Sequence, residues 1–196
     1  MKTDLETSHK AVLMHCCCGP CTLYPLETLR EEGYEVIGCF DNPNIHPYRE
    51  FQLRMDSFRT AAERFHLFAV IEKEYGLAAF MSSLQGCEEA VYQATSEARC
   101  AVCYRTRLEN VAAFCRKAGL AVFSTTLLVS PYQRHDMIRE IGEKVADEYG
   151  LSFLYRDFRT GFRQGQAAAQ EMGLHMQGYC GCVFSEYARY GKENAD

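Results

Sequence analysis

Residues 11–21 read AVLMHCCCGPC, and this short stretch decides the fold. The apolar run 11–15 predicts a first buried strand, because short apolar runs of this kind are typical of a parallel-sheet core. Cysteines follow at once, and a helix is predicted over residues 22–32, with Gly33 as its C-terminal stop. A strand that leads into a helix predicts a βα unit. Ligands bind beyond the carboxyl ends of strands in such sheets, so the cysteines are expected at the functional edge.

The alternation of short apolar runs and longer helical stretches continues along the chain. Further strands are predicted over residues 34–40, 67–71, 121–125 and 152–155. Further helices are predicted over residues 48–65, 104–117, 136–149 and 163–172, and an irregular helical pattern covers 76–98. The pattern indicates an α/β fold, namely a Rossmann-like open, mostly parallel sheet flanked by helices. Because no Pro/Gly/Ser-rich linker divides the chain, residues 1–196 are expected to form a single domain.

The composition is that of a globular protein with an unusual number of thiols. Eleven of the 196 residues are cysteine, while the hydrophobic fraction is 47% and the charged fraction 24%. These fractions exclude disorder, collagen and coiled coil as the main class, and no apolar stretch approaches the ~20 residues of a membrane span. The first residues do not form a secretory pattern, so we expect a cytoplasmic protein with no membrane partner and few stable disulfides. The cysteines therefore indicate a metal or redox role.

Arginine dominates the basic residues. The net charge is −5, yet there are 15 Arg and only 6 Lys. The planar guanidinium of Arg binds phosphate through two parallel hydrogen bonds, which the Lys ammonium does not provide in a fixed geometry. Six of these side chains form two local patches: Arg99, Arg105, Arg107, Arg156, Arg159 and Arg163. Such patches fit either local RNA binding by an acidic protein or ordinary solvated helix faces.

Eight of the cysteines form three groups. The groups are Cys16, Cys17, Cys18 and Cys21, then Cys100 and Cys103, then Cys180 and Cys182. Two distant pairs can make one four-thiolate site, which suits Zn²⁺ or a [4Fe–4S] cluster. Thiols are left over after any such site, so a neighbouring redox or second metal site is expected. A disulfide across the single-residue gap of the last pair would be strained and easily reduced, which favours a redox role. The isolated cysteines are expected to pack in the interior: Cys39, Cys87 and Cys115.

Two other function classes fit parts of the pattern. Residues 18–21, Cys-Gly-Pro-Cys, follow a strand and open a helix, as in the active site of thioredoxins. This motif favours thiol–disulfide exchange, although the chain contains no Trp and is much longer than a thioredoxin. The cysteine pairs and arginines also fit a non-catalytic, zinc-binding RNA module.

Several motifs in order resemble one known family. They are residues 15–21 (HCCCGPC), 42–47 (NPNIHP), 49–54 with Arg49, Glu50, Phe51 and Arg54, 99–108 (RCAVCY followed by Arg107 and Leu108), 125–133 (TTLLVSPYQ), 153–162 and 177–185 (QGYCGCVFS). The chain resembles the metal-dependent epoxyqueuosine reductases that do not use cobalamin, over about residues 11–190. It departs from the family pattern by Gly19, where Ala is expected, and by an extra thiol at Cys16.

The resemblance implies a fold, a reaction and partners. The fold would be related to the adenine-nucleotide α-hydrolase and PP-loop proteins, with cysteines in place of the phosphate loop. The reaction would reduce epoxyqueuosine in the anticodon loop of tRNA to queuosine, the last step of queuosine formation. Removing the epoxide oxygen takes two electrons and two protons, whereas a [4Fe–4S] cluster ordinarily passes one electron. A cluster beside a dithiol or second metal, and an external electron donor, are therefore expected.

The same resemblance implies a set of reactive residues. The expected cluster ligands are Cys17, Cys18, Cys100 and Cys103. Cys180 and Cys182 would be a redox-active dithiol or ligands of a second metal, iron or zinc, for which Cys21 is a further candidate. Asp41 and Asp157 are candidates for metal ligation or proton delivery.

Substrate contacts are expected on either side of these cysteines. The anticodon loop would be read through splayed bases and aromatic stacking. The residues expected near the base are His46, Tyr132, Gln133 and Tyr179. The residues expected at phosphates are Arg105, Arg107, Arg156, Arg159 and Arg163.

Overall fold

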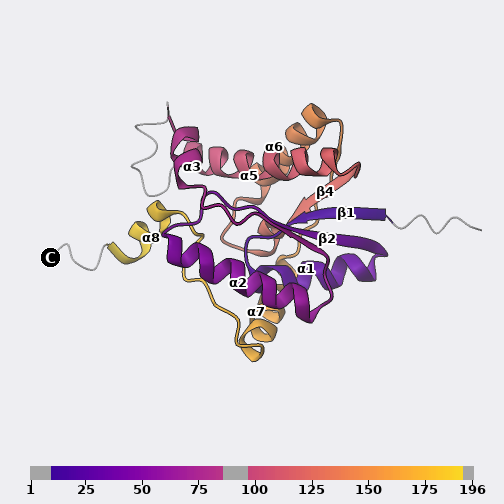
Figure 1. The fold of residues 1–196 in the computed structure, drawn as a ribbon, viewed down its shortest axis with the longest axis horizontal. Coiled ribbons are helices and arrows are strands. Elements are labelled where there is room, and N and C mark those ends of the chain that lie inside the picture. The colour runs from indigo at the N-terminus through magenta and orange to yellow at the C-terminus, as the bar shows by residue number, and fades with distance from the viewer. Residues whose placement is uncertain (1–9, 86–96, 192–196) are drawn as a thin grey trace, which may run out of the picture.

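Strands and helices alternate along most of the chain (Figure 1). The structure is a computed structural model and describes residues 10–85 and 97–191. The strands are β1 (Lys10–His15), β2 (Tyr34–Phe40), β3 (Ala69–Ile71), β4 (Val122–Thr125) and β5 (Ser152–Phe153). The α-helices are α1 (Gly19–Glu31), α2 (Tyr48–Arg64), α3 (Leu77–Ser83), α5 (Glu97–Lys117), α6 (His135–Tyr149), α7 (Phe162–Glu171) and α8 (Val183–Tyr190). Short 3₁₀ helices are η1 (Thr126–Val129) and η2 (Arg159–Gly161).

The strands form one parallel sheet in the order β3-β2-β1-β4-β5. His15, the last residue of β1, is in register with Cys39 of β2 and Thr125 of β4. Three strands therefore end in one row, and the segments that follow them leave from the same edge. This arrangement confirms the predicted fold class, a Rossmann-like parallel sheet with a cysteine-rich site at the carboxyl edge of the strands.

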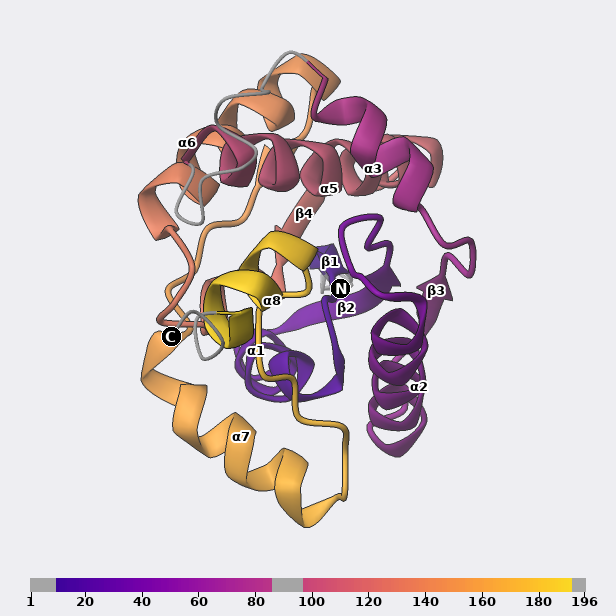
Figure 2. The same ribbon diagram turned by 90° about the vertical axis from the view of Figure 1, so that its left-hand side faces the viewer.

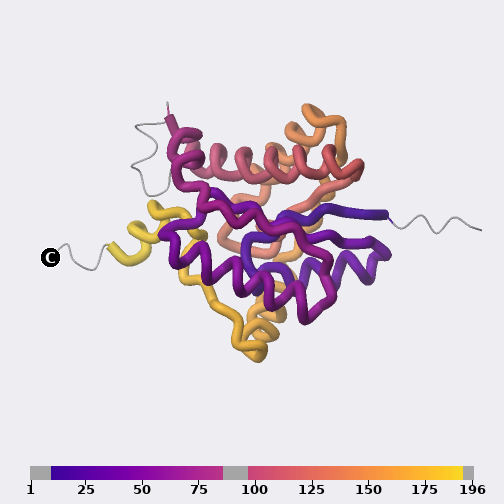
Figure 3. The backbone as a smooth tube through the Cα atoms, viewed as in Figure 1, coloured from indigo at the N-terminus to yellow at the C-terminus, as the bar shows by residue number. Residues whose placement is uncertain are grey.

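Helices cover both faces of the sheet (Figure 2). Helices α1, α2 and α7 lie on one face, and α3, α5 and α6 lie on the other. Because β1 is the central strand, Val12, Leu13 and Met14 are fully buried, as the apolar run predicted. After α7 the backbone returns along the carboxyl edge of the sheet to α8 (Figure 3). The segment before α8 thus reaches the same edge as the cysteines that follow β1.

Helix α1 begins three residues earlier than predicted, because Pro20 takes its place in the first turn. Proline suits that position, since its fixed φ is helical and its missing N–H would have no partner there. Cys18 caps the helix in an extended conformation, which places Cys21 inside the first turn. A Cβ on Gly19 would lie 2.5 Å from the carbonyl oxygen of Ser57 in α2. The close approach of α1 and α2 therefore explains why this chain has glycine where the family pattern has alanine.

Other boundaries also differ from the prediction. Helix α5 begins at Glu97 instead of residue 104, so Cys100 and Cys103 lie on its first turns. These turns contact a distant part of the chain: the Arg99 guanidinium lies 4.8 Å from the ring centre of Phe184 in α8. Helix α8 and η1 were not predicted, and β5 is shorter than expected. The part of the irregular pattern over residues 86–96 lies outside the described residues.

The isolated cysteines have separate environments. Cys39 and Cys115 are buried in the main core, as expected, and the Cys115 thiol donates to the carbonyl oxygen of Val122 (3.5 Å). Cys87 lies outside the described residues. Within residues 10–85 and 97–191, no helix has the length and apolar character needed to cross a membrane.

Candidate metal centre

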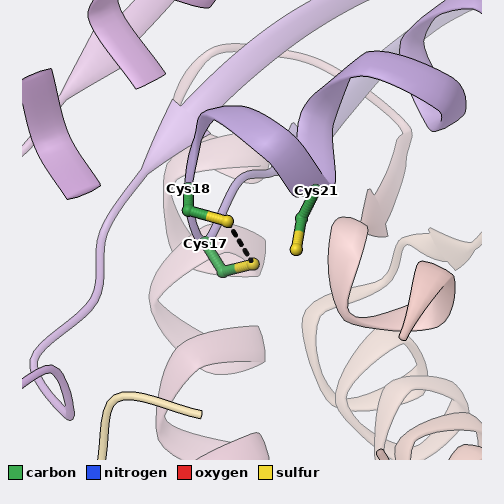
Figure 4. Close-up of side chains that lie close together, drawn as sticks. All are labelled: Cys17, Cys18 and Cys21. Carbon is green, nitrogen blue, oxygen red and sulfur yellow. Dashed lines mark hydrogen bonds between the residues drawn. The ribbon is translucent and has the colours of Figure 1, made fainter. Parts of the chain in front are cut away.

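Three buried sulfur atoms converge where β1 passes into α1. The Sγ atoms of Cys17, Cys18 and Cys21 all lie within 4.8 Å of one another, and those of Cys17 and Cys18 are 3.7 Å apart. Figure 4 shows the three side chains turned toward one point. Two thiolates on one tetrahedral metal, each at about 2.3 Å, would be about 3.8 Å apart. The donor set therefore fits a thiophilic metal such as zinc or iron.

The three thiols share protons unequally. Hydrogen bonds from Cys18 and Cys21 lower the pKa of Cys17 well below its usual value, against the effect of burial, and the charge of Arg107 lowers it further. Burial and the contact with Cys17 raise the pKa of Cys18, and the contacts with Cys17 and Cys18, together with burial, raise the pKa of Cys21. Without a metal, Cys17 is therefore the first of the three thiols to lose its proton as the pH rises, with its neighbours as hydrogen-bond donors. A bound metal would displace the remaining protons.

Each sulfur atom also receives a hydrogen bond from a distant part of the chain. The Thr126 hydroxyl donates to Cys17 Sγ (3.4 Å). The Gln177 side-chain amide donates to Cys18 Sγ (3.0 Å) and to Cys21 Sγ (3.3 Å). Outer hydrogen bonds of this kind orient metal ligands and tune their basicity.

Two buried guanidinium groups act on the sulfurs. Arg107, only 2% exposed, donates through Nη2 to the Asn42 side-chain oxygen (2.8 Å), and its charge lowers the pKa of Cys17. Arg54, 1% exposed, is paired with Glu50 (2.7 Å), and its charge lowers the pKa of Cys18. Together they offset the negative charge that several thiolates bring into a buried site.

His15, at the end of β1, supports the turn that carries the cysteines, and its ring forms hydrogen bonds with Thr125, Asn42 and Arg107 and not with a sulfur atom of the described residues. Burial and the charge of Arg107 lower its pKa to about 3, so the ring is neutral. His15 Nδ1 forms a hydrogen bond with the Thr125 hydroxyl (2.8 Å), and His15 Nε2 lies 3.2 Å from the Asn42 side-chain oxygen and 3.4 Å from Arg107 Nε, which donates to it. The Asn42 amide in turn donates to the backbone carbonyl of Cys16 (2.9 Å). This network fixes the turn that carries the cysteines.

Cys16 is separate from the three-sulfur group. Its side chain is fully buried, and its thiol donates to the backbone carbonyl of Met14 (3.2 Å). Burial raises its pKa well above the usual value. The extra thiol is therefore held as a neutral group in the interior of the sheet.

The remaining cysteines form a second neighbourhood near α8. Cys103 and Cys182 are buried, Cys100 is half-buried and Cys180 is exposed. Burial raises the pKa of Cys103 to about 12, and the charges of Cys180, Cys182 and Cys100 act in the same direction. Arg107 opposes that rise, just as it acts on Cys17. Both cysteine groups thus lie within the field of one guanidinium, although Cys100 and Cys103 are not among the sulfurs that lie within 4.8 Å of one another.

A protein-family model described as epoxyqueuosine reductase QueH matches residues 12–188. The chain belongs to the QueH family. It is 33% identical over 184 residues to an epoxyqueuosine reductase QueH of Dehalococcoides mccartyi, which covers 94% of this chain and 97% of the relative. It is 34% identical over 183 residues to the epoxyqueuosine reductase QueH of Thermotoga maritima, and this match covers 92% of this chain and 93% of the relative. The motifs predicted that the chain belongs to an epoxyqueuosine reductase family, and this prediction is confirmed.

A solved structure outside the QueH family shares the fold. It is described as a predicted subunit of tRNA methyltransferase from Methanocaldococcus jannaschii. The TM-score is 0.50 at 12% identity, and the match covers 82% of this chain and 76% of that chain. At this identity the likeness concerns the fold alone.

The two carboxyl groups predicted from the QueH resemblance lie in different environments. Asp41 follows β2 and is half-buried, and burial raises its pKa although the Asn110 amide donates to it (3.2 Å). Asp157 is exposed and paired with Arg159, which lowers its pKa to about 2. Of the two carboxyl groups, Asp41 is the one whose pKa is raised.

The residues predicted near the base are spread along the carboxyl edge. His46 is buried and donates through Nε2 to the Pro43 carbonyl oxygen (3.1 Å), while the Tyr179 hydroxyl donates to the His46 carbonyl oxygen (2.5 Å). Gln133 accepts from the Tyr104 hydroxyl (2.7 Å). Tyr132 is 84% exposed, with its ring centre 6.0 Å from that of Phe162 at the start of α7.

The predicted phosphate-binding arginines differ in exposure. Arg107 is buried beside the cysteines, so it does not face the surface as a phosphate contact would. Arg105 is paired with Glu109 and Glu148, and Arg156 with Glu32, all on the surface. Arg163 is exposed at the start of α7.

Sequence reasoning did not single out Thr126, Gln177, Arg54 or Asn42 as site residues, although each lies in a quoted motif. Their side chains act across large sequence separations, for example between Gln177 and Cys18. Spacing along the chain carries no signal for such contacts. The position of these residues in the quoted motifs indicated that their segments matter, but it did not indicate the role of each side chain.

Proposed function

We propose that this protein reduces epoxyqueuosine to queuosine in the anticodon loop of tRNA, as a cytoplasmic enzyme. The observation that carries the proposal is the match of the epoxyqueuosine reductase family over residues 12–188. The epoxide accepts two electrons and two protons, its two C–O bonds break, an alkene forms, and the oxygen leaves as water. An external electron donor must supply the electrons.

We propose that the electrons pass through a metal centre held by cysteine. The ligands implied by the motifs would hold a [4Fe–4S] cluster: Cys17, Cys18, Cys100 and Cys103.

 Support comes from Arg107, whose charge acts on both Cys17 and Cys103. Cys21, which lies within 4.8 Å of the first pair, would bind a second metal, iron or zinc, beside the cluster. Such a metal would polarise the epoxide oxygen when bound.

The chain's own residues would then hold charge and deliver protons. Arg54 and Arg107 keep the sulfur-rich site from becoming too negative to accept electrons. Asp41 has a raised pKa and leaves the same edge of the sheet, so we assign proton delivery to it. Asp157 is ionised in its pair with Arg159 and has no such role in this proposal.

Cys180 and Cys182 would provide the second redox function. They are free thiols in the structure, and Gly181 between them has a φ of 110°, which favours glycine. The exposed Cys180 thiol donates to the Ser185 hydroxyl (3.0 Å). An exposed thiol beside a buried one suits exchange with an external electron donor.

We propose that tRNA contacts the carboxyl edge around Tyr132. This ring is free to stack on an unpaired base, and its contact with Phe162 places it beside Arg163. The surface ion pairs of Arg105, Arg156 and Arg159 contribute little stability. These arginines can therefore exchange a carboxylate for a phosphate at low cost.

The activity is tested with protein purified without oxygen and tRNA that carries epoxyqueuosine. With dithionite as the reductant, nucleoside analysis should show queuosine in amounts that exceed the enzyme added. Absence of queuosine with metal-loaded protein would count against the proposed reaction. Loss of queuosine in cells that lack this protein, with epoxyqueuosine accumulating, is the matching result in vivo.

The ligand set is tested by changing one cysteine at a time. Cys103→Ser should lower the bound iron to a fraction of the wild-type content, whereas Cys115→Ser, also on α5, should leave it unchanged. Unchanged iron and sulfide in Cys103→Ser would remove Cys103 from the cluster. Cys21→Ser should then lose one metal per chain and keep the cluster.

The tRNA surface is tested with exposed aromatic residues. Tyr132→Ala should raise the KM for tRNA by about tenfold, since stacking on one base contributes about 1–3 kcal/mol. Phe68→Ala is the control, because Phe68 is 72% exposed in the turn before β3. An equal effect of both substitutions would show that Tyr132 has no specific contact with the RNA.

A further inference from the structure

The side-chain amide of Gln177 lies across two of the three sulfurs of the proposed metal centre. Its nitrogen is 3.0 Å from Cys18 Sγ and 3.3 Å from Cys21 Sγ. An amide nitrogen has two hydrogens, so one N–H can point to each sulfur. The residue belongs to the segment between α7 and α8, which Figure 3 shows passing along the carboxyl edge of the sheet. A single side chain therefore connects this segment to both cysteines.

The other end of the same amide is unsatisfied. The Gln177 side-chain oxygen is buried and has no hydrogen-bond partner among the described residues. A buried acceptor without a partner costs free energy, so the contacts of the nitrogen must favour this orientation. An amide N–H donates to a thiol sulfur, and more strongly to a charged thiolate. The orientation thus suits a metal-bound pair of thiolates, which have no protons of their own to place.

The remaining sulfur has its own donor. The Thr126 hydroxyl lies 3.4 Å from Cys17 Sγ. Gln177 and Thr126 thus supply a hydrogen bond to each member of the three-sulfur group. Hydrogen bonds to metal-bound sulfur withdraw electron density, and this is one of the factors that set the reduction potential of such centres.

We infer that Gln177 is a positioning residue that stabilises the Cys18 and Cys21 thiolates through two N–H···S hydrogen bonds and so strengthens metal binding at these cysteines. The inference rests on the proposed metal centre but not on the proposed substrate. It assigns a role to a neutral side chain that binds no metal itself.

The segment around Gln177 stays in place without this contact. Arg54 donates to the carbonyl oxygens of Tyr179 (2.9 Å) and Cys180 (3.1 Å). The backbone N–H of His46 donates to the Gly181 carbonyl oxygen (2.7 Å). A substitution at Gln177 should therefore act on the sulfurs without unfolding the protein.

The test measures binding of Co²⁺ alone to the metal-free protein under anaerobic conditions, by thiolate-to-cobalt charge-transfer absorption. Gln177→Leu keeps much of the volume but removes both donors, and should weaken Co²⁺ binding by about tenfold, the lower end of the effect of outer hydrogen bonds. Its charge-transfer band should move to longer wavelength, because thiolates without these bonds are more electron-rich. Gln177→Glu also removes both N–H donors, so its charge-transfer band should move in the same direction.

The matched control is Gln170→Glu, which makes the same change at an exposed position of α7. It should bind Co²⁺ as the wild type does. Wild-type affinity and an unshifted band in both Gln177 variants would overturn the inference while leaving the metal centre intact. A wild-type protein without a thiolate-to-cobalt band would instead refute the metal centre at these cysteines, and the inference with it.

Discussion

The two cysteine groups of this protein differ in how the fold holds them. Cys17, Cys18 and Cys21 lie on one short turn, are buried, and receive hydrogen bonds from other parts of the chain. The group near α8 combines α5 with a distant segment, and Cys180 is exposed there. Burial and outer hydrogen bonds favour a fixed set of ligands, whereas exposure favours thiol exchange. The first group thus suits the metal binding proposed for it, and the second suits the proposed thiol exchange with another molecule.

One serine substitution in each group tests this difference between the two cysteine groups most directly. Cys18→Ser should abolish both metal binding and queuosine formation, because it removes a ligand that is also the hydrogen-bond partner of Gln177. Cys180→Ser should keep the metal content and lose turnover. Metal analysis and nucleoside analysis on the same preparations give both quantities. Retained turnover in Cys180→Ser would end the dithiol role, and loss of metal would make Cys180 a ligand.

Alkylation of the metal-free protein measures the difference in exposure between the two cysteine groups. Iodoacetamide should modify Cys180 far sooner than Cys17, Cys18 or Cys21, since the buried thiols react only when the structure opens. An opening free energy of about 2 kcal/mol already slows the reaction by about 30-fold. Peptide mass spectrometry over time measures each site. Equal rates at Cys180 and Cys18 would show that the first group is open in solution.

Gly19→Ala tests whether the close approach of α1 and α2 supports the first group. The new Cβ would meet the Ser57 carbonyl at 2.5 Å, and a backbone atom cannot rotate away. We expect the free energy of unfolding to fall by about 1–3 kcal/mol, as measured by urea denaturation. Gly165→Ala is the control, because its Cβ would meet its nearest atom, the Pro20 carbonyl oxygen, at an ordinary 3.5 Å. Equal stability of the two variants would show that α1 can move away without cost.

A smaller effect is expected from a buried thiol that belongs to neither group. Burial, with the charges of Asp41 and Glu72, raises the pKa of Cys39 to about 12. A folded-state pKa above the unfolded value of about 8.5 gives stability that is present below that pH and is lost as the pH rises toward 12. Between pH 8 and pH 10.5, the free energy of unfolding of the wild type should therefore fall by about 2 kcal/mol more than that of Cys39→Ala. Urea denaturation at both pH values measures this, and parallel losses would contradict it.

The sequence predicted the central βα unit well, because the apolar run and the proline in residues 11–21 act locally. It failed where one helix supports another. In the first turns of α5, Arg99 stacks over Phe184 of α8, a contact that no local pattern can reveal. Arg107 was expected at phosphate because an arginine on a helix reads as a surface residue. Its burial follows from Asn42, 65 positions away along the chain.

The candidate site was predicted at the level of residue types and segments. The grouping of Cys17 with Cys18 followed from their adjacency, and their sulfurs are in contact. The expected partnership with Cys100 and Cys103 depends on how α5 packs over the sheet, and sequence spacing does not determine this. The ligand set beyond the first three sulfurs therefore stays a prediction.

Arg54 connects the two cysteine groups through a single guanidinium. It lies in the field of Cys18 and holds the carbonyl oxygens of Tyr179 and Cys180. A change in charge at one end must alter the free energy of the contacts at the other, and thermodynamic linkage makes that effect reciprocal. If a metal binds the first group as proposed, it would therefore also change the stability of the contacts that hold the segment with Cys180. A molecule that binds this segment would then change the metal affinity by the same factor.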